Sequence, residues 1–143
     1  MTTHLMIVHP RYVAPIMSGV KNVEARLGID RRAPYGRVTP GETVFIKPSG
    51  QRVLAKAVVR RVDEFEDLTP ELVRELRATY DDRIMGGDMY WNEKRNARYA
   101  TLITLERPAL IHSEASVPGE LLVASRNAWR TTEAAPLRVR QAA

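Results

Sequence analysis

Three charged residues stand at short intervals just after Gly19. Successive side chains of an extended strand point to opposite faces, so Glu24 and Arg26 share one face of a predicted strand, together with Asn22. Lys21 lies at the mouth of this strand, where we expect it to be exposed. Opposed charges therefore converge in a small space, where they could bind a ligand. The structural alternative is a salt-bridge cluster that closes the sheet and contributes little.

A basic loop follows this strand. The segment from Gly28 to Pro40 is interrupted by glycine and proline and carries Arg31, Arg32 and Arg37. A loop has no packing reason to hold so many cations, so we predict that these arginines contact the phosphates of a nucleic acid.

Three isolated residues are further candidates for ligand binding. His9 could bind phosphate or a base, although a histidine directly after a strand is more often a capping residue. Lys47, at the end of a predicted strand, could contact phosphate or could be a solvated charge. Trp91 could stack on a base, although aromatic residues in a chain with only 6% of them usually fill the core. The same two alternatives apply to Tyr90 and Tyr99.

The elements that must position these residues begin with a strand at residues 5–8 and a short helix over residues 12–18, which Pro15 predicts to be kinked or to start late. A strand over residues 22–26 follows. Residues 43–47 and 52–62 form a predicted hairpin, because turn residues lie before and between them. No regular alternation of strand and helix occurs, which favours a mixed barrel-like domain over a doubly wound sheet.

The second half of the chain contains a predicted helix with Thr69 as its cap and Leu72, Val73 and Leu76 on its buried side. Asp88 is predicted to cap a short helix that carries Trp91. Residues 99–105 form the last clear strand. We expect the domain to span residues 1–112, followed by a C-terminal extension, residues 113–143, whose last part from residue 131 is a loose basic tail.

Composition excludes several classes of protein. The chain has 143 residues, with 44% hydrophobic and 27% charged residues, which is ordinary for one folded domain. It has no cysteine, and its three histidines lack metal-ligand spacing, so we expect no disulfide, no metal and no cofactor. No apolar run is long enough to cross a membrane and no signal peptide is recognisable, so we expect a cytoplasmic protein that does not bind membranes.

The net charge of +5 is unevenly distributed. Residues 1–61 carry eleven Lys or Arg against three Asp or Glu, whereas residues 62–93 carry three against ten. Clustered cations favour polyanionic partners, because neutralising phosphates releases condensed counterions. The acidic stretch at residues 63–75 is a predicted helix that could instead recognise a protein partner. The oligomeric state is left open.

The pattern of Gly19, Lys21, Glu24 and Arg26 resembles the ASCH family of the PUA-like superfamily, whose hallmark is a G-x-K-x-x-E-x-R segment after a first strand and helix. Two further segments fit the resemblance: residues 39–44 are similar to the family's P-G-[DE]-x-V motif, and residues 98–103 to its closing strand. Together they cover about residues 4–106. The resemblance implies an α+β fold, a PUA-like mixed β-barrel of about five to six strands with two to three flanking helices.

The resemblance also implies a cleft beside the Gly19 to Arg26 segment that binds RNA or a modified nucleoside. Some relatives hydrolyse acylated cytidine, and nuclease activity has been attributed to others. In the hydrolysing branch a lysine corresponding to Lys21 assists a threonine three residues later, but this chain has Glu24 there, which could act only as a general base for water. We therefore expect a protein that binds RNA or a nucleoside, with a small amidohydrolase or ribonuclease using Lys21 and Glu24 as the alternative.

Overall fold

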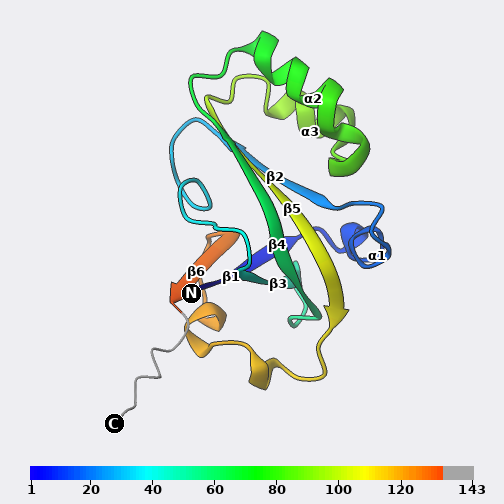
Figure 1. The fold of residues 1–143 in the computed structure, drawn as a ribbon, viewed down its shortest axis with the longest axis vertical. Helices are drawn as coiled ribbons and strands as arrows, with labels where there is room; N and C mark the ends of the chain where they lie inside the picture. Colours follow the sequence, from blue (N-terminus) through cyan, green and yellow to red (C-terminus); the bar gives the residue numbers. More distant parts are fainter. Residues whose placement is uncertain (134–143) are drawn as a thin grey trace.

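The structure, a computed structural model, describes residues 1–133 of the chain. Its centre is one six-stranded mixed sheet with the strand order β2-β5-β4-β3-β1-β6. β1 and β3 are parallel, and the other neighbouring strands are antiparallel. The long strands β4 and β5 bend so that the sheet curls into a half-barrel (Figure 1). The strands are β1 (Thr2–Val8), β2 (Val23–Gly28), β3 (Thr43–Pro48), β4 (Ala55–Phe65), β5 (Tyr99–Leu110) and β6 (Trp129–Glu133).

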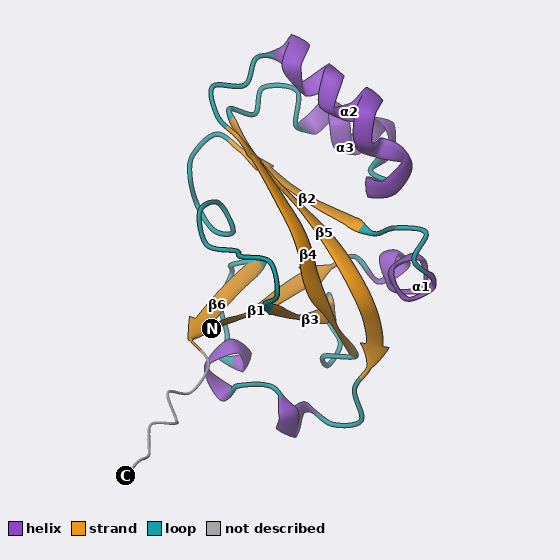
Figure 2. Cartoon of the chain, viewed as in Figure 1, coloured by secondary structure: helices purple, strands orange, loops and turns teal. Residues whose placement is uncertain are grey.

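The helices lie outside the curled sheet (Figure 2). α2 and α3 lie together over one end of the sheet, and α1 lies beyond the start of β2. The described helices are α1 (Val13–Ser18), α2 (Pro70–Ile84) and α3 (Gly87–Glu93), with short 3-10 turns η1 (Pro10–Tyr12), η2 (Glu114–Ser116) and η3 (Gly119–Leu122). The predicted α+β fold, a mixed β-barrel of about five to six strands with two to three flanking helices, is therefore confirmed, and the barrel is a half-barrel of six strands.

The turn from α1 into β2 follows the sequence prediction. α1 starts only at Val13, so Pro15 lies in its first turn, where a missing backbone N–H removes no hydrogen bond. Gly19 ends the helix in the left-handed region, with φ of 85°. Lys21 N donates to the Pro15 carbonyl, which fixes the chain as it turns into β2.

The two faces of β2 carry different kinds of side chain. Val23, Ala25 and Leu27 point outward and pack beneath α2 and α3, in a core that also contains Leu102 and Trp91. The alternate residues point the other way, toward the interior of the half-barrel. Strand alternation therefore sets the charged face of β2 apart from the apolar face on which the helices rest.

The structure differs from the predicted helices in several details. Thr69 caps α2 as predicted, because its side chain accepts from Leu72 N, but Leu72 itself is 40% exposed and Val73 and Leu76 alone of the three are buried. Gly86, not Asp88, is the N-cap of α3. The acidic stretch at residues 63–75 is not one helix, because β4 continues in register with β5 as far as Phe65.

The C-terminal segment joins the sheet. Residues 131–133, predicted as part of a loose tail, belong to β6, which pairs antiparallel with β1 from Met6 to Thr2. Trp129 at the start of β6 is 4% exposed and Leu121 of η3 is also buried. Burial of Trp129 and Leu121 therefore fixes part of residues 113–133, which were predicted to be an extension, against the sheet. The rest of the predicted tail, residues 134–143, lies outside the described residues.

Candidate ligand-binding cleft

A cleft of about 670 Å³ opens beside β2, on the side where the half-barrel is not closed by strand pairing. Its walls come from β2, the end of β1, the loop between β2 and β3, α3 and the segment that leads into β6. The charged and aromatic side chains that line it are His9, Tyr12, Glu24, Arg26, Asp30, Arg32, Tyr35, Arg37, Tyr90, Lys94, Tyr99, Arg126 and Trp129. This cleft lies beside the segment of residues 19–26, where the family resemblance implies one.

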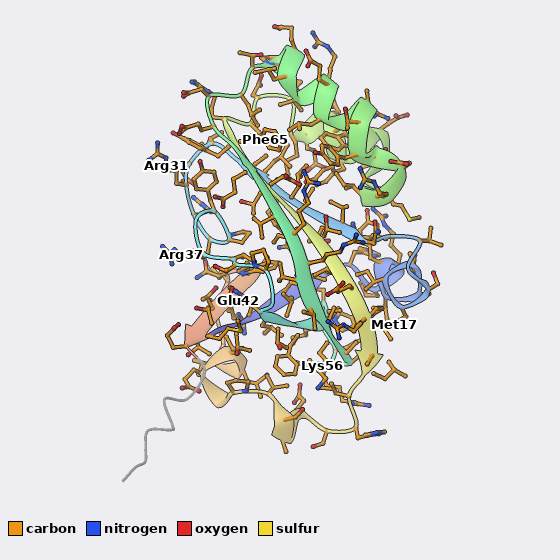
Figure 3. All side chains as sticks on the ribbon, in the orientation of Figure 1. Met17, Arg31, Arg37, Glu42, Lys56 and Phe65 are labelled. Atoms are coloured by element: carbon orange, nitrogen blue, oxygen red, sulfur yellow. The ribbon has the colours of Figure 1, made fainter. Side chains whose placement is uncertain are left out.

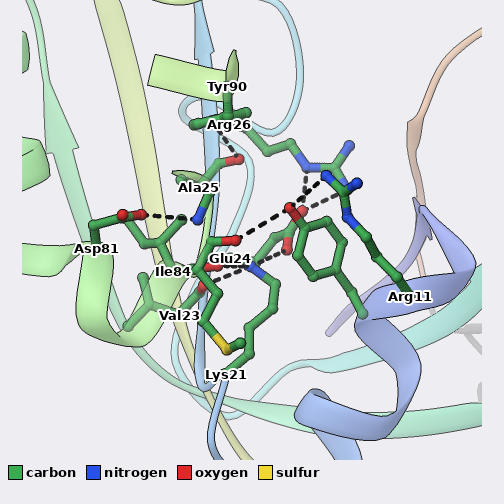
Figure 4. A network of polar contacts seen from close by, with 12 residues as sticks. Arg11, Lys21, Val23, Glu24, Ala25, Arg26, Asp81, Ile84 and Tyr90 are labelled. Atoms are coloured by element: carbon green, nitrogen blue, oxygen red, sulfur yellow. Dashed lines mark hydrogen bonds and ion pairs between the residues drawn. The ribbon is translucent and has the colours of Figure 1, made fainter. Parts of the chain in front are cut away.

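Glu24 lies between two cations (Figure 4). Its Oε2 accepts from Arg26 Nε at 2.8 Å and lies 2.8 Å from Arg26 Nη2, and its Oε1 lies 3.4 Å from Lys21 Nζ. Glu24 and Arg26 are two residues apart on β2 and share a face, as predicted, while Lys21 reaches the carboxylate from the turn before the strand.

The charge state of Glu24 follows from these contacts. Burial by itself would raise the pKa of the Glu24 carboxyl, but the nearby charges of Arg26 and Lys21 outweigh burial and hold the pKa below its usual range. Glu24 is therefore an ionised acceptor. A carboxylate with a lowered pKa takes up a proton poorly, so this arrangement is suited to hydrogen bonding and unsuited to general-base chemistry.

Lys21 is buried, which corrects the expectation of an exposed lysine at the cleft mouth. Its side chain is 4% exposed and does not line the cleft. Nζ donates to the carbonyl oxygens of Ile84 and Val23, and it lies 4.7 Å from the centre of the Tyr12 ring. Lys21 thus joins the end of α2 to the start of β2, because burial of an ammonium group requires such partners.

Arg26 spans the gap between β2 and the far edge of the sheet. Its guanidinium donates to the carbonyl oxygens of Ile7 and Ala128 and lies 5.5 Å from the centre of a Trp129 ring. Glu24 holds the same guanidinium from the other side. Arg26 therefore connects three segments that are far apart in the sequence and forms part of the cleft floor.

The three arginines of the loop between β2 and β3 do not all line the cleft. Arg32 and Arg37 line the cleft, whereas Arg31 does not. Arg31 lies 5.3 Å from the Tyr99 ring centre and pairs with Glu66 at 3.5 Å, and Arg32 is held by Asp30 at 2.8 Å. Figure 3 shows Arg31 and Arg37 on the same side of the molecule. Arg37 has no side-chain partner among residues 1–133.

The three isolated candidates are placed differently from one another. His9 lines the cleft and also caps η1, because its Nδ1 accepts from Arg11 N at 3.1 Å. Lys47 lies on β3 in register with Ile7 and does not line the cleft. Trp91 is buried beneath α2 and donates through Nε1 to Asp81 at 2.7 Å, so it belongs to the outer core rather than to the cleft.

Tyr90 and Tyr99, which were candidates for stacking on bases, line the cleft, whereas sequence reasoning missed Tyr35, Lys94 and Arg126 as members of the site. Tyr35 and Tyr99 pack edge to face with ring centres 5.4 Å apart, and the Tyr90 hydroxyl donates to the Ala25 carbonyl. Lys94 and Arg126 add two cations. Arg126 and Trp129 precede or belong to a strand that had no predicted counterpart, so no sequence signal placed them near β2.

The cleft carries an excess of positive charge. Five of its lining side chains are Lys or Arg, and two are Asp or Glu. Across residues 1–133 no three His, Asp or Glu side chains gather as a set that could hold a metal ion. The groups that the cleft offers are therefore mainly cations and aromatic rings, with Glu24 as its buried carboxylate.

The fold can be compared with known structures. No family model and no curated protein matches this sequence. The crystal structure of ASCH from Zymomonas mobilis matches with a TM-score of 0.61 and 19% identity, covering 76% of this chain and 70% of that chain. A mutant of the same protein matches with a TM-score of 0.61 and 18% identity over 77% of this chain and 71% of that chain. This chain has the ASCH fold.

A second mutant of the Zymomonas mobilis protein gives a TM-score of 0.59 and 17% identity over 76% of this chain and 74% of that chain. The resemblance inferred from Gly19, Lys21, Glu24 and Arg26 is thus confirmed at the level of the fold. In this ASCH fold the four motif positions form the turn from α1 and the inward face of β2. None of the helices in residues 1–133 is both long and apolar enough to span a lipid bilayer.

Proposed function

We propose that this protein binds single-stranded RNA or a nucleoside in the cleft beside β2. The observation that carries the proposal is the combination of unpaired cations at the rim with aromatic rings along the walls. Proteins that bind single strands use this combination, because cations follow the phosphates while aromatic rings accept the bases.

The cations supply the attraction for phosphates. Arg37, Lys94 and Arg126 line the cleft and form no ion pair with any residue in the described part of the chain. A guanidinium that is already held by a carboxylate, such as that of Arg32, has less to gain from a phosphate. We therefore assign the phosphate contacts to Arg37, Lys94 and Arg126 and expect less from Arg31 and Arg32.

The shape of the cleft favours an unpaired nucleotide. Tyr35, Tyr90 and Tyr99 contribute rings to a concave volume of about 670 Å³, in which a base could stack. Bases in an RNA duplex are stacked on one another and unavailable to such a concave site, whereas unpaired bases can leave the stack. Glu24 offers an ionised acceptor to amino or hydroxyl groups of the ligand.

Hydrolysis of an acylated nucleoside or of RNA is the less favoured alternative. A general base must take up a proton, and Lys21 and Arg26 stabilise the ionised form of Glu24. Lys21 is bound to two backbone carbonyls and lies outside the cleft lining. Binding without turnover is the function that these contacts support.

Fluorescence anisotropy with a labelled single-stranded RNA tests the proposal. We expect Arg37→Glu and Arg126→Glu each to weaken binding about tenfold, since each replaces an attraction for phosphate with a repulsion. Arg74→Glu is the matched control, because Arg74 is exposed on α2 and does not line the cleft. Absence of binding at low salt, or equal losses in all three variants, would refute the proposal. RNA cleavage or deacylation that Glu24→Gln abolishes would establish the alternative.

A further inference from the structure

His4 is a titratable residue buried at the centre of the sheet, outside the cleft. It lies on β1, between β3 and β6, and is 0% exposed. Its Nε2 lies 2.8 Å from Glu42 Oε1, and its Nδ1 lies 3.2 Å from Trp129 Nε1 and 3.0 Å from Thr131 Oγ1. Both ring nitrogens thus have partners, and those of Nδ1 are on β6.

The chemistry of these partners fixes the form of the imidazole. An indole N–H only donates, so His4 Nδ1 must be the unprotonated nitrogen that accepts from Trp129. The proton of the neutral ring is therefore on Nε2, where it is donated to Glu42. Burial by itself would raise the pKa of the Glu42 carboxyl, but hydrogen bonds from His4 and from Thr39 N lower it, so Glu42 is ionised.

Trp129 links His4 to the cleft. Its ring centre lies 5.5 Å from that of His4, and the Arg26 guanidinium also lies 5.5 Å from the centre of a Trp129 ring. The preceding residue, Ala128, accepts hydrogen bonds from Ile7 N and from Arg26. Trp129, Ala128 and Arg126 all line the cleft. The position of β6 on β1 therefore sets one wall of the cleft.

We propose that protonation of His4 loosens β6 from β1 and thereby opens the cleft wall formed by residues 126–129. A second proton on the ring must go to Nδ1, which then faces the Trp129 N–H as donor against donor. Thr131 Oγ1 can accept the new proton, but the indole loses its only partner in the described chain. The strand thus keeps its register while its buried anchor is lost.

Few charged groups of the described residues lie near the His4 ring. Among residues 1–133, the one charged group in contact with the ring is Glu42, which lies in the turn before β3. β3 presents Val44 opposite His4, and β4 adds Ala57 and Val59 to the same interior. On β6, Arg130 donates to backbone carbonyls and Glu133 accepts from Thr2, and Arg26 contacts the Trp129 ring at 5.5 Å.

NMR of the free protein tests the strand directly. The ring signals of His4 report its protonation between about pH 8 and about pH 5, and hydrogen exchange reports the protection of the β6 amides. We expect protection factors in β6 to fall about fivefold to tenfold as His4 is protonated, while those in α2 do not follow it. If His4 takes up a proton and β6 keeps its protection, or if His4 takes up none before the whole protein unfolds, the inference is wrong.

Trp129→Phe supplies the decisive variant, since it keeps an aromatic ring but removes the donor that opposes protonated His4. We expect the pH dependence of β6 protection to be lost in this variant. Trp91→Phe is the matched control, because its indole N–H is bonded to Asp81, and it should retain the pH dependence. Equal pH dependence in the two variants would also overturn the inference.

The expected effect of His4 protonation on the affinity for RNA rests on the proposed function and is measured separately. We expect the affinity for single-stranded RNA to fall over the pH range in which β6 loosens, and to fall less in Trp129→Phe. If β6 loosens but RNA binds equally well throughout, the coupling is refuted. If RNA binds at no pH, the proposed function fails, whereas the hydrogen exchange of β6 still decides the behaviour of His4.

Discussion

Replacement of Lys21 by methionine distinguishes a structural lysine from a ligand-binding one. Methionine keeps most of the aliphatic stem but has no donor for the Ile84 and Val23 carbonyls, and it leaves Glu24 with one cation instead of two. A buried pair that loses one partner costs about 3–5 kcal/mol. Because Arg26 still holds the carboxylate, we expect the lower end of this range, about 3 kcal/mol of unfolding free energy.

A loss of this size is measurable in a domain of this length. It corresponds to a decrease of about 10 °C in the melting temperature. Circular dichroism during heating, together with urea titration, measures both quantities. Lys94→Met is the matched control, because Lys94 lines the cleft and has no ion pair among the described residues. We expect that variant to melt within about 2 °C of the parent and to bind RNA less tightly.

Two results would contradict a structural role for Lys21. If Lys21→Met melts at the parent temperature but loses RNA binding, the lysine acts on the ligand. Its contacts with Ile84, Val23 and Glu24 would then not determine its role. If Lys94→Met is as unstable as Lys21→Met, the difference in burial between the two lysines is not what determines their contribution.

Three further outcomes are expected. The pKa of Glu24 is lower in the folded protein than its reference value of 4.5. The ionised Glu24 therefore contributes fully to stability above about pH 4.5, and this contribution is lost as the pH falls through the pKa of the folded state. Glu24→Gln should flatten this part of the acid unfolding curve. Arg37→Ala should reduce the slope of log affinity against log salt by about 0.7 for single-stranded RNA, and an unchanged slope would exclude a phosphate contact. Gly86→Ala should cost about 1–3 kcal/mol in thermal unfolding, because its Cβ would lie 2.7 Å from Tyr90 Cδ2, whereas Gly119→Ala, which meets nothing within 4 Å, serves as the control.

The fold near the motif could be predicted from local patterns. Gly19 marks the end of a helix, and the alternation of Glu24 and Arg26 defines one face of a strand. The hairpin of β3 and β4 follows from turn residues on both sides, and Thr69 is a regular helix cap. In each case the determining interactions lie within a few residues along the chain, where sequence patterns carry information.

Long-range packing decided what the sequence did not reveal. The burial of Lys21 depends on the Ile84 carbonyl, which is 63 residues away, and no local pattern indicates that contact. β6 is held by a partner strand 127 residues distant at His4, so its five residues gave no recognisable strand signal. The same cause explains why Arg126 and Trp129 were missing from the predicted site.

The pairing of β1 with β6 has a consequence for how the chain is synthesised. β1 leaves the ribosome before the other five strands, yet one of its two edges can be covered only after residues 129–133 have been made. Until then an open row of backbone donors and acceptors remains beside a largely buried strand, and such an edge pairs readily with other chains. A version of this protein that stops at residue 112 should therefore self-associate in a manner that depends on concentration, and the addition of a peptide with the sequence of residues 113–133 should suppress that association.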